Sequence, residues 1–300
     1  MLYNVEAPGE WGQVRATAPV QAATETLAMA DGCKLFLRSW RTGSQDVLLL
    51  LHGLGAHSGW FIDMGNELAA RGLNVYTVDH RGFGRSEGLP GHVEQAENYL
   101  SDLAAVVKEI QRRHLSEVQP ARLYVLGHSM GGIFATYLAA RQGALLRGVI
   151  FLNPWVQDSV KVPLGMTLGV FGGGLLRSKR RWRNPGGTDG MTTNPEAITM
   201  LEADPYWRRD LTANFFLQIF LLRTQVLKQT PLISRPALVL QAEQDKTVIL
   251  AASRKLYETL ASTDKTWKVY PYYAHDAELE VDRAQLDQDI VEWIQKHADA

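Results

Sequence analysis

Ser129 is the residue best placed for chemistry in this sequence, because it lies in the middle of the motif Gly127-His-Ser-Met-Gly131. The apolar run Leu123 to Leu126 precedes the motif, and apolar residues at helical spacing follow it. A strand that turns directly into a helix strains the middle residue and lifts its hydroxyl clear of the sheet. The pattern predicts that Ser129 is a nucleophile beside the free amides of the next helix.

An oxyanion formed at such a serine needs backbone donors close by. A second glycine-rich loop, His52-Gly-Leu-Gly55, directly follows the apolar run Val47 to Leu51. A run of this kind is typical of a parallel strand buried on both faces, and ligands bind at the carboxyl end of such strands. We predict that the backbone amides of Leu54 and Met130 form an oxyanion hole.

The base is expected after the serine, because folds with this serine turn place nucleophile, acid and histidine in that order. Two histidines follow Ser129, namely His275 and His297. His297 lies three residues from the chain end on a predicted terminal helix, where we expect it to be solvated. His275 follows the predicted strand Trp267 to Tyr270, so we predict that His275 is the base.

The acid must lie between the serine and the histidine, on a loop that follows a strand. Glu243 and Asp245 come after the predicted strand Ala237 to Gln241. Asp245 is the preferred candidate because it lies deeper in the loop, from where its carboxylate can reach the His275 ring. Glu243 remains the second candidate. Asp276 is a remote third, because it adjoins the histidine that it would have to orient.

These side chains require a scaffold of alternating strands and helices, and most of the sequence has that pattern. We predict an α/β fold with a mostly parallel central sheet flanked by helices, with an antiparallel hairpin around Asp31-Gly32 at one edge. The alternation stops after residue 154, and apolar helical segments at 162–176 and 211–227 replace it. The predicted division is an N-terminal arm over 1–22, a core over 23–154 and 233–300, and a helical cap over 155–232.

Composition limits the partners and the location. With 300 residues, a net charge of −1 and 46% hydrophobic residues, the chain can bury a large core and offers no general attraction for nucleic acid. No disulfide framework is expected from one cysteine, Cys33, and we expect a cytoplasmic protein. No apolar stretch reaches the roughly 18 residues of a membrane span. We expect no cofactor and no metal, because neither a metal-ligand cluster nor a phosphate-binding loop occurs.

One charged segment stands out from the near-neutral total. Residues 177–183, Arg-Ser-Lys-Arg-Arg-Trp-Arg, carry five positive charges beside a tryptophan. We interpret the segment as a solvated surface loop, with a patch that attracts anionic lipid head groups as the alternative. Transient membrane contact through the cap is therefore a hypothesis.

Several motifs together resemble the monoacylglycerol lipase and lysophospholipase branch of the α/β-hydrolase superfamily. They are His52-Gly-x-Gly-x-His-Ser-Gly59, Asp79-His-Arg-Gly-x-Gly-x-Ser-x-Gly88, Gly127-His-Ser-Met-Gly-Gly132, Asp245 and His275. The resemblance spans about residues 24 to 298. It implies a catalytic triad of Ser129, Asp245 and His275, with Leu54 and Met130 as oxyanion donors. It also implies a cap with an apolar acyl-chain tunnel and hydrolysis of carboxylic esters with an apolar acyl group through an acyl-enzyme.

Two positions depart from the family pattern. Ala56 stands where an acidic residue is usual, and Tyr-Tyr-Ala precedes His275 in place of a turn that contains glycine. We expect both to line the entrance to the site, so they bear on the substrate. A thioesterase, an amidase or a carbon–carbon hydrolase with the same triad remains an alternative, as does a ligand receptor without catalysis, which would have no need of all three groups.

Overall fold

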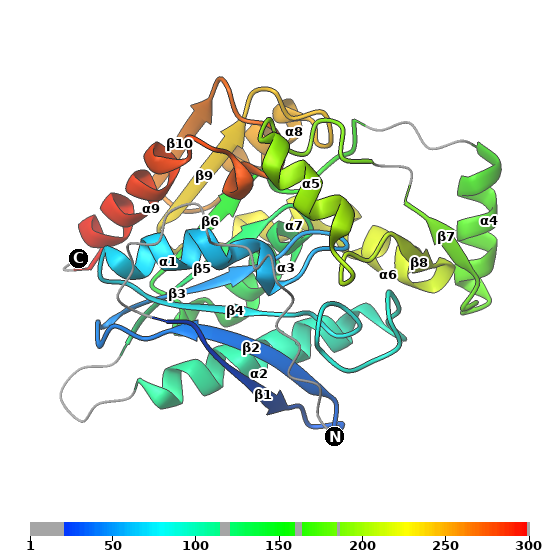
Figure 1. Cartoon of the computed structure of the whole chain (residues 1–300), viewed down its shortest axis with the longest axis horizontal. Coiled ribbons are helices and arrows are strands. Elements are labelled where there is room, and N and C mark those ends of the chain that lie inside the picture. Colours follow the sequence, from blue (N-terminus) through cyan, green and yellow to red (C-terminus); the bar gives the residue numbers. More distant parts are fainter. Residues whose placement is uncertain (1–20, 115–120, 160–163, 185–186, 299–300) are drawn as a thin grey trace.

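In the computed structural model of this chain, residues 21–114, 121–159, 164–184 and 187–298 are described. Eight strands form one central sheet, in the order β1-β2-β4-β3-β5-β6-β9-β10 (Figure 1). The strands are Ala23–Ala28 (β1), Lys34–Trp40 (β2), Asp46–Leu51 (β3), Asn74–Val78 (β4), Arg122–His128 (β5), Gly148–Leu152 (β6), Ala237–Ala242 (β9) and Lys265–Tyr270 (β10). The arm expected over residues 1–22 lies almost entirely outside the described residues.

The sheet is mostly parallel. Only the pairs β1–β2 and β2–β4 are antiparallel, whereas the pairs from β4 through β3, β5, β6 and β9 to β10 are parallel. The predicted fold class and the predicted edge hairpin are confirmed.

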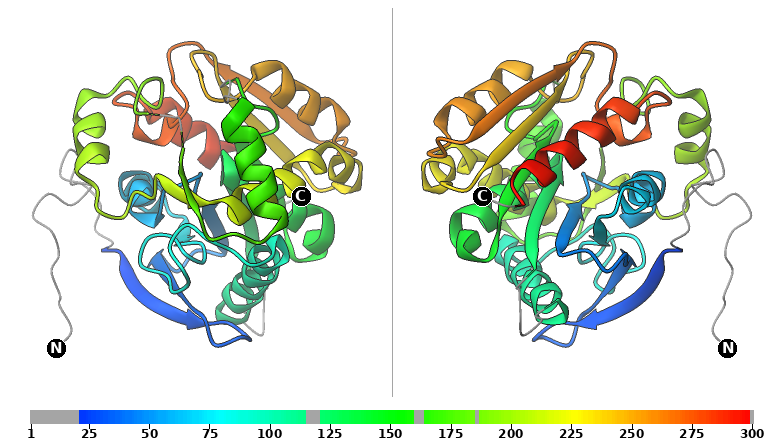
Figure 2. Two further views of the ribbon diagram at one scale, coloured as in Figure 1. Left: turned by 90° about the vertical axis from the view of Figure 1, so that its right-hand side faces the viewer. Right: turned by 90° about the vertical axis from the view of Figure 1, so that its left-hand side faces the viewer.

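Helices cover both faces of the sheet because its central strands are apolar on both sides. In β3, Val47, Leu49 and Leu51 pack into one hydrophobic core, while Leu48 and Leu50 pack into the other. The first core takes in α2, α3 and α8, and the second takes in α1 and α9, on the two sides of the sheet in Figures 1 and 2. These helices are Ile62–Ala70 (α1), Ala96–Arg113 (α2), Met130–Gln142 (α3), Leu250–Thr259 (α8) and Ala284–Lys296 (α9).

The parallel strands bring the predicted site residues to one edge of the sheet. Ser129 directly follows β5, and the loops with Asp245 and His275 follow the neighbouring strands β9 and β10. The register of these two strands pairs Ala242 with Tyr270. Asp245 therefore lies three residues after Ala242, and His275 lies five residues after Tyr270, which is the partner of Ala242.

Much of the segment between β6 and β9, including α4, β7, β8 and α6, lies on the right of Figure 1. Its helix α4 packs against α6, and the left view of Figure 2 shows α4 in front. Part of the basic segment 177–183, expected as a loop, is strand β7, which pairs with β8. The division between core and cap stays a prediction. The segment contains Leu164–Leu175 (α4), Arg181–Arg183 (β7), Pro195–Ala203 (α5), Asp210–Thr212 (β8), Ala213–Thr224 (α6), Val226–Gln229 (α7) and the short helical turn Thr230–Leu232.

Candidate active site

Ser129 has the strained backbone that its motif predicts. Its φ is 51° and its ψ is −115°, and its amide donates to the Leu152 carbonyl at 3.1 Å. A Cβ atom on Gly127 would lie 2.3 Å from the Gly131 carbonyl oxygen, and one on Gly131 would lie 2.1 Å from the Leu51 carbonyl oxygen. Glycine at 127 therefore lets β5 and α3 approach each other, and glycine at 131 lets α3 approach the end of β3.

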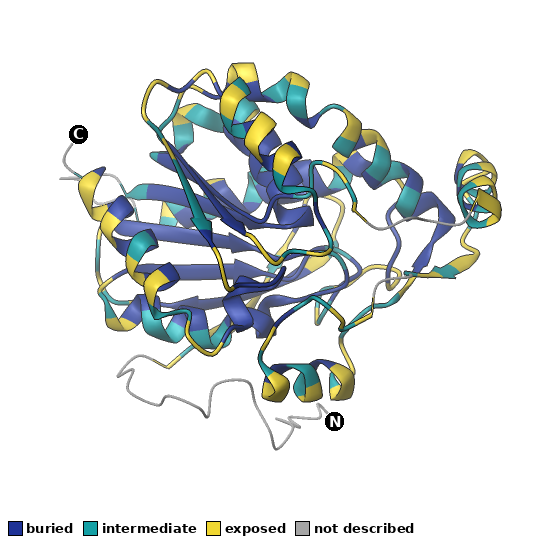
Figure 3. Ribbon diagram, turned by 90° about the horizontal axis from the view of Figure 1, so that it is seen from above, coloured by how far each residue is buried: buried dark blue, intermediate teal, exposed yellow. Residues whose placement is uncertain are grey.

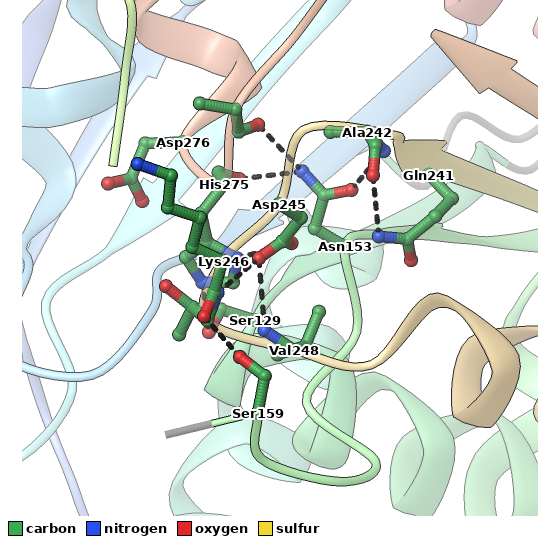
Figure 4. Close-up of polar contacts among 12 residues, drawn as sticks. Ser129, Asn153, Ser159, Gln241, Ala242, Asp245, Lys246, Val248, His275 and Asp276 are labelled. Atoms are coloured by element: carbon green, nitrogen blue, oxygen red, sulfur yellow. Dashed lines mark hydrogen bonds and ion pairs between the residues drawn. The ribbon is translucent and has the colours of Figure 1, made fainter. Parts of the chain in front are cut away.

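The structure brings Ser129, His275 and Asp245 into one hydrogen-bonded line (Figure 4). Nε2 of His275 lies 2.9 Å from Oγ of Ser129, and Nδ1 lies 2.7 Å from Oδ2 of Asp245. All three side chains are buried: Ser129 and His275 are each 5% exposed, and the Asp245 side chain is 1% exposed. This is the spacing that transfer of the serine proton to the histidine requires.

The second oxygen of Asp245 fixes the carboxylate in its loop. Oδ1 accepts the Thr247 amide at 2.7 Å and the Val248 amide at 2.9 Å, which leaves Oδ2 for His275. Glu243, the second candidate, is exposed. Asp276, the third candidate, lies next to His275 but is not the carboxylate on its ring Nδ1.

Charge and burial act in opposite directions on this pair. Burial lowers the pKa of His275, but the Asp245 carboxylate outweighs burial, and the pKa is raised above the usual value of 6.5. Burial raises the pKa of Asp245, but His275 and the two loop amides outweigh burial, and the pKa is lowered from 3.8. An ionised Asp245 would therefore stabilise the imidazolium that forms if His275 takes the proton of Ser129.

His297 is not solvated as expected. It is 2% exposed, its Nδ1 lies 2.6 Å from the Trp293 carbonyl, and its Nε2 lies 2.9 Å from Asp264. The apolar face of α9 packs on the sheet and carries the end of the helix inward with it. His297 therefore joins the last helix to the loop before β10, away from Ser129.

Leu54 and Met130 flank Ser129 in the way the oxyanion prediction requires. Met130 is the first residue of α3, and Leu54 lies in the loop after β3 and lines the cavity over the serine. In the part of the chain that the structure describes, neither backbone amide donates to another protein group. Both donors can therefore be offered to a bound oxygen.

The His52 ring holds the loop that carries Leu54. Its Nδ1 donates to the Gly53 carbonyl at 2.8 Å, and its Nε2 accepts the His80 amide at 3.0 Å. Burial places the pKa of His52 well below its usual value, so the ring stays neutral and can accept this bond. Sequence reasoning assigned no role to His52 beyond its place in the motif.

A cavity of about 380 Å³ opens above Ser129 and His275. One part of its wall is apolar and comes largely from α4 and α6, with Met166, Val170, Phe171, Phe216 and Phe220. The Phe171 and Phe220 rings pack edge to face with centroids 4.9 Å apart. A largely half-buried apolar wall beside a candidate nucleophile suits a hydrocarbon chain.

Position 56, where the sequence departs from the family pattern, lies in an apolar cluster beside the cavity wall. Ala56 is buried in a small apolar cluster with Trp60, Leu201 and Leu279, and the Trp60 ring lines the cavity. The expectation that position 56 and the Tyr-Tyr-Ala segment line the entrance is wrong for the described residues, because neither is part of the cavity wall. Ala56 is instead packed among these buried side chains.

Asp204, which sequence reasoning missed, joins the segment after α5 to the loop around Trp60. Its Oδ2 accepts from His57 Nε2 at 2.8 Å and from Trp60 Nε1 at 2.9 Å. Beside it, the Arg208 amide donates to the Gly55 carbonyl at 2.8 Å. No local pattern could indicate contacts between positions almost 150 residues apart.

A buried polar group lies behind His275 and was also missed. Nε2 of His128 donates to the His275 carbonyl at 3.0 Å, so its Nδ1 carries the lone pair. Glu278 Oε1 lies 3.1 Å from that Nδ1. Burial and the neighbouring Asp276 raise the pKa of Glu278 well above its usual range, and burial lowers the pKa of His128 to about 3. Burial therefore favours the neutral forms of both Glu278 and His128.

Metal binding at this site would compete with the hydrogen bonds that His275 makes to Ser129 and Asp245. Among the described residues, His128, His275 and Asp276 place one possible ligand atom each within 4.8 Å of one another. Both ring nitrogens of His275 already contact Ser129 and Asp245. An ion held by His275 would have to break one of these contacts, so the arrangement fits acyl transfer by side chains better than metal binding.

The sheet order and the contact of serine, histidine and aspartate at its carboxyl edge define the class of the α/β-hydrolases. The chain belongs to the family described as serine aminopeptidase, S33, whose model matches residues 42–282. The resemblance to the monoacylglycerol lipase branch is confirmed by the relatives, and with it the expected class of carboxylic ester hydrolases.

Two relatives and two solved structures illustrate the likeness. A monoacylglycerol lipase of Mycolicibacterium smegmatis is 26% identical over 91% of this chain and 96% of its own length. The human monoglyceride lipase is 28% identical over 81% of this chain and 80% of its own length. The structure of a soluble variant of the Saccharomyces cerevisiae monoglyceride lipase with a substrate analog matches with a TM-score of 0.81 at 21% identity, over 94% of this chain and 96% of that one. The Paleococcus ferrophilus monoacylglycerol lipase matches with a TM-score of 0.76 at 23% identity, over 93% and 99%. The two structures support the fold.

Proposed function

We propose that this protein hydrolyses carboxylic esters with an apolar acyl chain, of the monoacylglycerol or lysophospholipid type, through an acyl-enzyme on Ser129. The observation that carries the proposal is the line from Asp245 through His275 to Ser129 at the base of an apolar cavity. The relatives named as monoacylglycerol lipases support the substrate class.

In the first half of the reaction, Oγ of Ser129 attacks the ester carbonyl while Nε2 of His275 takes the serine proton. The amides of Leu54 and Met130 hold the negative oxygen of the tetrahedral intermediate. Asp245 keeps the His275 ring oriented and stabilises its positive charge. His275 then gives the proton to the leaving alcohol, which departs and leaves the acyl group on Ser129.

In the second half, water attacks the acyl-enzyme. His275 takes a proton from the water, the same two amides hold the second oxyanion, and the proton returns to Oγ of Ser129 as the fatty acid leaves. We place the acyl chain against the wall formed by Val170, Phe216 and Phe220. No other group is needed to balance the reaction.

The test is a panel of monoacylglycerols, lysophospholipids, acyl-thioesters and p-nitrophenyl esters of graded chain length, compared by kcat/KM. Ser129→Ala should lower kcat at least about 10³-fold, because only binding and the oxyanion donors remain. The matched control is Ser101→Ala, a serine on the exposed face of α2. Equal turnover by Ser129→Ala and the parent contradicts the proposal. A clear preference for acyl-thioesters in the panel would favour a thioesterase over the proposed ester hydrolase.

We also propose that the protein contacts membranes transiently through α4 and the basic segment after it. Leu164, Leu168 and Leu175 share a helix face and are 73%, 65% and 76% exposed, and Leu176 is 83% exposed. Figure 3 shows this helix largely exposed at the right-hand end of the molecule. Five exposed cations follow in the chain: Arg177, Lys179, Arg180, Arg181 and Arg183.

Apolar side chains and cations together fit an anionic lipid surface. Each Lys or Arg near such a surface adds about 1 kcal/mol of attraction, and exposed leucines insert below the head groups. Another face of α4 carries Met166 and Val170, which line the cavity. A lipid bound to α4 would therefore start close to the acyl wall. Among the described residues, no helix is both long and apolar enough to cross a membrane.

Sedimentation with vesicles of phosphatidylcholine, with and without phosphatidylglycerol, tests the membrane contact. Leu164→Ser with Leu168→Ser should abolish binding, and Arg180→Gln with Arg181→Gln should abolish the preference for anionic vesicles. The control is Leu232→Ser, whose parent side chain is 61% exposed on the turn after α7. Unchanged binding by the leucine variant contradicts this part of the proposal.

We propose a cytoplasmic location, supported by the single cysteine. Cys33 is free and half-buried, as suits a reducing compartment. Fractionation of the native host, with antibody detection, tests it.

A further inference from the structure

Asn153 is the first residue after β6, and its position is unusual. It is fully buried and has a φ of 44°, in the left-handed region that asparagine adopts more readily than most residues with a side chain. Its backbone amide donates to the Leu240 carbonyl of β9 at 2.9 Å. The side chain is thereby presented to the loops that follow β9 and β10 (Figure 4).

The side-chain amide of Asn153 bridges those two loops. Its Nδ2 donates to the His275 carbonyl at 2.6 Å, and its Oδ1 accepts the Ala242 amide at 2.7 Å. Ala242 ends β9, three residues before Asp245. One planar group thus contacts the residue at the start of the acid loop and the backbone of the base itself. A shift of either loop relative to the other breaks one of these two bonds.

We propose that Asn153 is a positioning residue that holds the loop of His275 in register with the loop of Asp245, so that both ring nitrogens of His275 reach their partners together. The inference rests on the proposed function, because the positioned groups are those of the Ser129 reaction. The Nε2 donor of His128 meets the same carbonyl at 3.0 Å. The carbonyl of the base is therefore held from two sides, and Asn153 links it to the strand of the acid.

The effect of losing this bridge can be separated from a loss of substrate binding. Asn153 is fully buried and is not among the described residues that line the cavity, so we expect no contact between its side chain and the substrate. A misplacement of about 1 Å in a reacting group can cost about 10²-fold in rate. Removing the bridge should therefore lower kcat and leave KM near its parent value.

Asn153→Gly is the first test, because glycine accepts the left-handed backbone and removes both side-chain bonds. We expect kcat to fall about 10²-fold, with KM within about twofold and the acid limb of the kcat/KM profile at lower pH. The limb should move because Asp245 then supports the positive charge of His275 less well. Asp276 and His128, which also lie near the His275 ring, are unchanged in this variant.

The matched control is Asn74→Gly. Asn74 is fully buried, its Oδ1 accepts the Thr42 amide at 2.8 Å, and its Nδ2 donates to the Ser44 carbonyl. Its side-chain amide likewise makes two bonds, but both go to the one loop between β2 and β3, which they join to the start of β4 on the opposite edge of the sheet. We expect it to lose thermal stability and to keep the parent kcat and acid limb. A parent kcat and acid limb in Asn153→Gly overturns the inference.

Asn153→Asp keeps the acceptor for Ala242 and places an oxygen against the His275 carbonyl in place of the donor. If Asn153→Gly does not fold, Asn153→Asp decides: a reduced kcat supports the inference and a parent kcat overturns it.

An NMR titration of the His275 ring protons gives a readout without turnover. A lower pKa in Asn153→Gly than in the parent supports positioning, and an unchanged pKa overturns it. A parent enzyme without esterase activity contradicts the proposed function alone, and the titration still decides the role of Asn153.

Discussion

Nε2 of His57 lies 2.8 Å from Oδ2 of Asp204, with the two side chains 9% and 2% exposed. This contact joins the loop of the proposed oxyanion donor to the segment that follows α5. The same carboxylate oxygen accepts from Trp60, whose ring lines the cavity. One buried carboxylate therefore holds a wall of the cavity and the loop beside the serine together.

Removing the Asp204 carboxylate should make both the Trp60 part of the cavity wall and the loop that carries His57 less firmly held. Asp204→Ala removes the acceptor that the His57 and Trp60 rings share, and we expect a loss of about 1–3 kcal/mol in the free energy of unfolding. Denaturant titration measures the loss, and steady-state kinetics should show a raised KM because the Trp60 ring is no longer held. Glu202→Ala, on the exposed side of α5, is the control and should change neither. Parent-like stability of Asp204→Ala would show that the contact is not structural.

Activity should fall on the acid side as His275 becomes protonated. Burial lowers the pKa of His275, but Asp245 raises it above 6.5 overall, and the base works only when neutral. We expect kcat/KM to fall as the pH drops through this raised pKa. Asp245→Asn should lower kcat about 10³–10⁴-fold and move the acid limb to lower pH, since burial then acts without the carboxylate. An acid limb in Asp245→Asn at the parent position contradicts the assignment of Asp245.

Glu278 should make the fold less stable at high pH. Burial raises the pKa of Glu278 in the folded state, so its contribution is fully present below the unfolded value and is lost as the pH rises through the folded value. Glu278→Gln keeps a donor for His128 and has no proton to lose. We expect melting temperatures close to the parent at pH 5 and higher than the parent at pH 9. The control, Glu243→Gln, changes an exposed carboxylate and should follow the parent at both values.

Filling the apolar wall should shorten the preferred acyl chain. Val170 is 8% exposed and lines the cavity from α4. Val170→Trp should lower kcat/KM for long-chain esters at least about tenfold and leave p-nitrophenyl acetate near the parent value. Leu168→Trp, on the exposed face of the same helix, is the control in detergent-free assays with monomeric substrates. An equal effect on short and long chains would place the acyl group elsewhere.

Patterns within one stretch of sequence were sufficient for the scaffold. The glycine spacing around Ser129 follows from the close approach of two backbones, and the alternating cores of β3 follow from the period of two in a strand. The order of elements also allowed the loops with Asp245 and His275 to be assigned to one edge of the sheet. These predictions depend on local sterics and on chain order, both of which a sequence displays.

Contacts between segments that are distant in the sequence could not be predicted from local patterns or from chain order. Nothing near Asp204 indicates His57, and nothing near Asn153 indicates that its side chain meets both Ala242 and His275. His297 was misjudged for the same reason, because its burial depends on how α9 packs and not on its distance from the chain end. Asparagine tolerates the left-handed backbone seen at position 153, but the proline that follows it favours an extended residue, so the local sequence did not indicate this conformation.

The register between β9 and β10 determines which segments of this chain can gain or lose residues without separating Asp245 from His275. Ala242 of β9 pairs with Tyr270 of β10. Asp245 lies three residues after Ala242 and His275 lies five residues after Tyr270, and these two loop lengths let the side chains meet. One inserted or deleted residue in either loop would move a reacting group by a full residue step of about 3.3 Å. The stretch between β6 and β9 contains neither group, so additions there leave the count intact. New substrate ranges can therefore arise by growth of that stretch, while the two short loops must keep their lengths.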